Sequence, residues 1–110
     1  MDDTIRQERC AQVAAAIIAL MPTLLEGKSR PNRLQDALEP LSRIRAVADA
    51  GSSGISHDDY LRWLGVAPEN LGRIEAAVRN GDADGAFAAF RDPENGLHLL
   101  VQGCQGCQGW

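Results

Sequence analysis

The apolar residues of this chain recur at intervals of three and four residues, and glycine or proline separates one such stretch from the next. This spacing puts apolar side chains on one face of a helix, whereas a half-buried strand would alternate apolar and polar residues. We therefore predict an all-α protein of six helical segments with short connections. An alternative remains for residues 86–102, where two apolar runs flank Arg-Asp-Pro-Glu-Asn-Gly and would form the hairpin of a winged helix.

The first predicted helix covers residues 3–21 and carries a regular apolar stripe. Its members recur at spacings of three or four residues and are Cys10, Val13, Ile17, Leu20 and Leu24. Pro22 lacks a backbone N–H, so it is expected to end or kink this helix near Met21. We interpret the stripe as a core face, and leave open a seam for a homodimer through the N-terminal helix.

Length and charge limit the class of protein. At 110 residues, with 45% hydrophobic and 24% charged residues, the chain fits one globular domain. A net charge of −4 argues against a surface that coats nucleic acid, although a local basic patch stays compatible with it. No apolar run reaches the roughly 20 residues that span a bilayer, and the acidic start Met1-Asp2-Asp3 is unlike a signal peptide. We expect a cytoplasmic protein with no membrane partner.

Capping residues and breakers define the remaining helices. These are expected at residues 40–50, 56–64, 68–79, 83–90 and 93–102. The second of them begins at a Ser-x-x-Asp capping box at Ser56 and stops at Gly65. Pro68 is a favoured first residue for the next helix, and Asp82 is a favoured cap for the one after it.

Residues 55–75 join two of these helices through a short turn. About eight helical residues are followed by Leu-Gly-Val, and a second helix begins one residue later. Two helices joined by a three-to-four-residue turn that contains glycine are typical of a helix-turn-helix. The stretch resembles the helix-turn-helix of phage-repressor-like (XRE) regulators, with a likeness limited to about residues 41–90. The resemblance implies a DNA-binding transcriptional regulator with its helix-turn-helix at residues 55–79.

The resemblance also implies which side chains contact DNA. Asn70 would pair with adenine, Arg73 would pair with guanine, and Glu69 would accept from cytosine. Arg62 and Arg79 would contact phosphates. These five residues are the predicted DNA-binding site.

The residue types of this segment support DNA binding less strongly than the spacing of its helices does. Residues 41–80 hold as many acids as arginines, so a dimer is needed to supply enough phosphate contacts. Ala67 would face outward together with the reading residues. Gly72 costs its helix about 1 kcal/mol relative to alanine, which a close backbone approach would explain.

The last nine residues repeat one tripeptide as Gln-Gly-Cys, Gln-Gly-Cys and Gln-Gly-Trp. Cys104 and Cys107 have the Cys-x-x-Cys spacing that chelates a soft metal such as zinc or forms a disulfide. His98 and Cys10 of the same chain, or the same cysteine pair from a second subunit, would complete the four ligands that zinc prefers. In a reducing cytosol, without metal, the two tail cysteines are expected to remain thiols that sense metal or redox state.

The tail also supports two further function classes. We expect residues 1–102 to form one helical domain and residues 103–110 to form a flexible tail.

A helical leader before a Gly/Cys/Trp tail resembles precursors of ribosomally made, modified peptides, and the implied partner is a modifying enzyme that acts on the tail. The other class is a helical protein that handles thiols or metals and does not bind DNA. No pattern of Ser, His or Cys indicates a catalytic site, so we do not expect an enzyme.

Overall fold

The computed structural model describes residues 4–110, which form five α-helices and one 3-10 helix joined by loops. They are α1 (Thr4–Ser29), η1 (Pro31–Ala37), α2 (Leu38–Asp49), α3 (Asp58–Arg79), α4 (Ala83–Phe90) and α5 (His98–Gly103). No described residue lies in a strand, so the all-α prediction is confirmed. The hairpin alternative is wrong, because α4 and α5 occupy that range. The expected helix start at Asp3 and the acidic residues before it lie outside the described residues.

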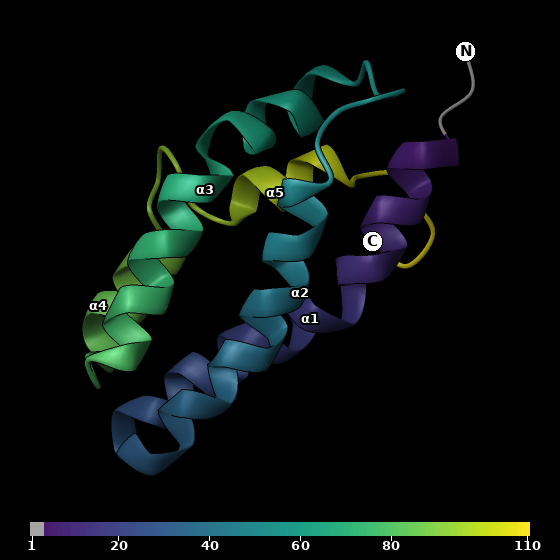
Figure 1. Cartoon of the computed structure of the whole chain (residues 1–110). Helices are drawn as coiled ribbons and strands as arrows, with labels where there is room; N and C mark the ends of the chain where they lie inside the picture. Colours follow the sequence, from purple (N-terminus) through teal and green to yellow (C-terminus); the bar gives the residue numbers. More distant parts are fainter. Residues whose placement is uncertain (1–3) are drawn as a thin grey trace.

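The helices pack as two pairs with α5 between them. Helices α1 and α2 lie side by side and are joined at one end by η1, while α4 lies against the second part of α3 (Figure 1). Helix α5 packs on α3. The shared core is mainly aliphatic, and its largest buried side chains, Tyr60 and Trp63, contact edge to face with ring centroids 5.5 Å apart.

Helix α1 continues beyond the proline that was expected to end it. Pro22 lies inside α1, which ends at Ser29, so the predicted end near Met21 is wrong. The last turns are held by packing on η1, because Gly27 is buried and an added Cβ there would lie 2.7 Å from the Leu34 side chain. The packing of α1 on η1 thus offsets the free-energy cost of the backbone hydrogen bond that Pro22 removes.

The predicted apolar stripe of α1 faces the core. Four of its five members are fully buried, namely Cys10, Val13, Leu20 and Leu24, which confirms the core-face interpretation. Because these side chains are already packed within their own chain, they are not available as a seam between two chains.

By length and hydropathy, α1 is also the one described helix that could cross a membrane. The expectation that no segment is long and apolar enough was therefore too strict. A core helix of a globular protein passes the same test, and one face of α1 is indeed buried in this fold. On its other side, the large apolar residues Ile18, Met21 and Leu25 are exposed.

Helix α3 is continuous where two helices and a turn were expected. Gly65 lies inside the helix, and Pro68 is an interior residue rather than the first residue of a new helix. A proline in a helix interior removes one hydrogen bond and crowds the carbonyl four residues earlier, which bends the helix. Figure 1 shows that the start of α3 runs in a different direction from its longer second part. The predicted Leu-Gly-Val turn is wrong, since a bend within one helix takes its place.

The two predicted helix caps have different outcomes. Asp82 caps α4 as expected, and its Oδ1 accepts a hydrogen bond from the Gly85 N–H at 2.8 Å. The cap of α3 is His57 rather than Ser56, with His57 Nδ1 accepting from the Tyr60 N–H at 3.4 Å. Helix α3 therefore begins later than the capping box predicted, with two aspartates in its first turn.

Candidate functional site

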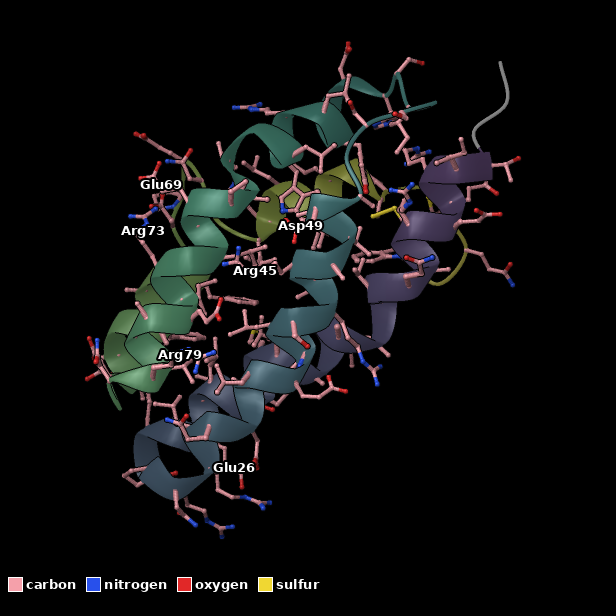
Figure 2. All side chains as sticks on the ribbon, viewed as in Figure 1. Glu26, Arg45, Asp49, Glu69, Arg73 and Arg79 are labelled. Atoms are coloured by element: carbon pink, nitrogen blue, oxygen red, sulfur yellow. A yellow bond between two sulfur atoms is a disulfide. The ribbon has the colours of Figure 1, made fainter. Side chains whose placement is uncertain are left out.

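A disulfide bond joins the first helix to the residue that follows the last one. Cys10 on α1 is bonded to Cys104 at the end of α5, across a sequence separation of 94. Figure 2 shows this sulfur–sulfur bond in yellow beside α1. Both cysteines are fully buried. The expectation that Cys104 remains a thiol is therefore wrong, because the fold brings Cys10 into bonding distance of it.

Polar contacts hold the C-terminal segment against α1 on both sides of the disulfide. The Arg6 Nη1 group donates to the Gly103 carbonyl oxygen at 2.8 Å, and the Trp110 Nε1 group donates to the Cys10 carbonyl oxygen at 3.0 Å. Residues 103–110, expected as a flexible tail, are thus packed on the helical domain. Cys104 and Cys107 are both buried, so this fold would shield them from an enzyme that modifies the tail.

The third cysteine is a free thiol close to this bond. Cys107 is 5% exposed, and its backbone N–H donates to the Cys104 carbonyl oxygen at 3.0 Å. Such a turn brings the Cα atoms of its first and fourth residues within about 7 Å. Disulfides join Cα atoms that are roughly 4.4–6.8 Å apart, so Cys107 is also placed as a bonding partner for Cys104.

The predicted zinc site does not form. Among residues 4–110, no group of three His, Cys, Asp or Glu side chains could hold a metal ion. Cys10 and Cys104 have no thiolate to offer while they are bonded to each other. His98 lies exposed in the first turn of α5, where it lines an apolar groove instead.

Two residues that were expected to face DNA point into the protein. Asn70 is 2% exposed, and its Nδ2 group donates to the Ala89 carbonyl oxygen at 2.8 Å. Ala67 is fully buried. The Asn70 amide therefore ties α3 to α4, and its pairing with a base would require this contact to break.

The other predicted reading residues are exposed on the outer face of α3. Figure 2 shows Glu69 and Arg73 on the same side of this helix. The Arg73 guanidinium forms an ion pair with Asp92 at 3.2 Å, and Arg62 is exposed on the first part of α3. Without an intervening turn, these side chains do not belong to a separate recognition helix. DNA binding stays a prediction that these positions do not support.

Arg79, the second predicted phosphate contact, belongs to a small ionic network. Glu75 accepts from Arg79 at 3.1 Å and from Arg45 on α2 at 3.0 Å. The hydrogen bond from Arg79 is the main reason why the pKa of Glu75 is lowered, and Arg45 adds to it. An added Cβ at Gly72 would meet only the Arg45 guanidinium, at 3.9 Å. The close backbone approach expected at Gly72 is therefore absent.

Tyr60 is a functional candidate that the sequence did not single out. It is fully buried under α5, where an added Cβ at Gly103 would lie 2.8 Å from the Tyr60 Cα. Within the described part of the chain, its hydroxyl has no hydrogen-bond partner. Burial raises the pKa of Tyr60, while the positive charge of Arg9 opposes that shift.

Comparisons with models of known protein families, with curated proteins and with solved structures find no match to this chain. The three cysteines form the site with the best-defined chemistry, because one of them can bond with either of the others.

Proposed function

We propose that this chain is a small helical thiol-disulfide protein in which Cys104 exchanges its partner between Cys10 and Cys107. The observation that carries this proposal is the free thiol of Cys107, three residues after the bonded Cys104 and in the same turn. Exchange proceeds by attack of a thiolate on a disulfide sulfur, so a third cysteine beside the bond supplies an intramolecular route.

The exchange step conserves the number of disulfide bonds. Cys107 loses its proton, and its thiolate attacks the Cys104 sulfur. A Cys104–Cys107 bond forms as the Cys10–Cys104 bond breaks, and Cys10 leaves as a thiolate that takes up a proton. No oxidant is consumed, whereas formation of either bond from thiols requires one, such as oxidised glutathione.

Exchange changes how firmly α1 is attached. The Cys10–Cys104 bond closes a long loop and ties α1 to the end of α5, whereas a Cys104–Cys107 bond closes only a short one. Because the entropic effect of a disulfide grows with loop length, the exchanged form retains less than half of that stabilisation. The Arg6 and Trp110 hydrogen bonds still link α1 to the C-terminal segment in that form.

The direct test is to map the disulfide in glutathione buffers of increasing oxidised fraction. After acid quenching and alkylation, trypsin releases Cys10 in peptide 10–28 and the other two cysteines in peptide 92–110. The native bond links the two peptides, whereas the exchanged bond lies within the second one and lowers its mass by two hydrogens. We expect the linked form to dominate and the internal form to increase in mild denaturant.

The matched variant is Cys107→Ser, which preserves the native bond and removes the attacking thiol. Its disulfide should be reduced more slowly by glutathione than that of the wild type. Equal reduction rates, together with no internally bonded peptide 92–110, would mean that the disulfide is purely structural.

A further inference from the structure

An apolar groove of about 740 Å³ lies on the side of α1 that the core leaves exposed. Its first wall is made by Ile17, Ile18, Met21 and Pro22, and none of the three cysteines lines it. The Ile18 side chain is 69% exposed and Met21 is 45% exposed. Large apolar side chains gathered at one exposed place are typical of a binding site rather than of an ordinary surface.

The opposite wall comes from the other end of the chain. It consists of Phe90 at the end of α4, Pro93 in the following loop, and Leu97 and Val101 beside and within α5. The groove therefore lies between α1 and the region from the end of α4 to α5. Its volume falls within the range of roughly 300–1,000 Å³ that is usual for sites of small molecules.

Hydrogen bonds fix the loop that carries this second wall. Asp92 Oδ1 accepts from the backbone N–H groups of Glu94 and Asn95 at 2.9 and 3.1 Å. The Leu97 N–H donates to the Phe90 carbonyl oxygen at 3.1 Å. The second wall is thus preformed, which lowers the entropy lost when a ligand binds.

No acidic residue lines the groove, so its lining carries no negative charge. Arg91 and His98 are its polar lining residues. Within residues 4–110, no carboxylate forms an ion pair with the Arg91 guanidinium, which lies 5.4 Å from the centre of the Phe87 ring. An anionic group that binds Arg91 therefore displaces no carboxylate from it, and the His98 imidazole offers a second N–H donor.

We propose that this groove binds an amphipathic anion, a small molecule with one carboxylate and a linear apolar chain. The apolar chain of the ligand lies between the α1 wall on one side and Leu97 and Val101 on the other. The carboxylate of the ligand pairs with Arg91, and His98 is the other polar residue of the lining. A second copy of this protein is a poorer occupant, because a symmetric contact would bring two copies of the same cationic groove together.

The test uses the disulfide-intact, ¹⁵N-labelled full chain with sodium decanoate below its micelle concentration. Amide shifts are expected for Ile18, Met21, Leu97 and Val101. Octanoate should bind about tenfold more weakly, since each buried methylene changes affinity by about three- to fourfold. Decyltrimethylammonium, which has an alkyl chain one carbon longer and a positive head, should bind at least tenfold more weakly than decanoate.

Two variants separate the charge from the fold. Arg91→Gln should weaken decanoate binding about five- to tenfold. Arg62→Gln removes the same charge from an exposed position outside the groove and should leave binding unchanged. Cys107→Ser should bind decanoate as the wild type does, so this result does not depend on thiol exchange.

Three results would overturn the proposal. One is equal affinity for decanoate and decyltrimethylammonium, which means that the groove selects no charge. Another is equal weakening by Arg91→Gln and Arg62→Gln. The last is movement of the groove amides on dilution without any ligand, which identifies the groove as a contact between two copies of the chain.

Discussion

The Trp110 indole N–H donates to the carbonyl oxygen of Cys10 at 3.0 Å, although 100 residues separate them in the sequence. This contact lies next to the Cys10–Cys104 bond, so the Trp110 side chain packs near the disulfide. Trp110 is therefore held against α1 by a hydrogen bond.

Cys10→Ser should lower the free energy of unfolding substantially. A disulfide that closes a loop of about 100 residues contributes roughly 4–5 kcal/mol by the loop-entropy estimate. Urea denaturation monitored by circular dichroism, with and without reductant, measures the loss. Cys107→Ser is the matched control and should lose much less. A wild-type midpoint that is unchanged by reductant would show that the bond adds no stability.

Gly65→Ala and Gly103→Ala should have opposite effects on stability. Gly65 lies within α3 with nothing within 4 Å of an added Cβ, so alanine should stabilise the helix by about 0.5–1 kcal/mol. At Gly103, the added Cβ would lie 2.8 Å from the Tyr60 backbone, so the variant should be destabilised. Thermal melts of both variants measure the difference. Destabilisation by Gly65→Ala would instead support a turn at this position, as in a helix-turn-helix.

Asn70→Ala should destabilise the packing of α4 on α3. The variant removes the Asn70 hydrogen bond to the Ala89 carbonyl oxygen, which still accepts from the Asp92 N–H at 3.3 Å, so the loss should be about 0.5–1.5 kcal/mol. Chemical denaturation gives the value, and hydrogen exchange of the α4 amides shows whether the loss is local. Asn80→Ala, at an exposed position just after α3, is the control and should change stability little. Equal effects of the two variants would argue against a structural role for Asn70.

Tyr60→Phe should make the protein more resistant to alkaline unfolding. The folded pKa of Tyr60 is raised by burial, so the unfolded chain loses the tyrosine proton at a lower pH than the folded chain does. Stability from this group is complete below the unfolded pKa of about 10 and is lost as the pH rises through the folded pKa. The phenylalanine variant lacks this loss and costs little at neutral pH, because the buried hydroxyl has no partner.

Tyr60 is the single tyrosine of the chain, so ultraviolet difference absorbance follows its ionisation directly. The wild-type titration should begin above the ordinary tyrosine range and coincide with unfolding. Ionisation at the ordinary pKa in a chain that remains folded would contradict the buried placement.

The sequence pattern was sufficient where local chemistry decides the structure. The spacing of Cys10, Val13, Leu20 and Leu24 identified the buried face of α1, and Asp82 identified the start of α4. Pro22 and Gly65 misled, because both are tolerated inside longer helices whose stability comes from tertiary packing. The same error placed a turn before Pro68 and made Asn70 look like an exposed residue of a recognition helix.

The candidate site was harder to predict for a different reason. Three cysteines allow three pairings, and sequence spacing alone does not select among them. The Cys-x-x-Cys spacing drew attention to Cys104 and Cys107, whereas the observed bond to Cys10 depends on α5 docking beside the start of α1. The groove at Arg91 and His98 was missed because its two walls are about 70 residues apart in the sequence.

The position of the disulfide also determines how the protein would respond to mechanical force. If Thr4 and Trp110 were pulled apart, tension would pass through the Cys10–Cys104 bond. The segment between Cys10 and Cys104 would then carry no tension. The shielded segment would hold back roughly 300 Å of extended chain, which reduction or exchange to Cys107 would release in a single step. In a stretched molecule, the bonding partner of Cys104 would therefore set the accessible length.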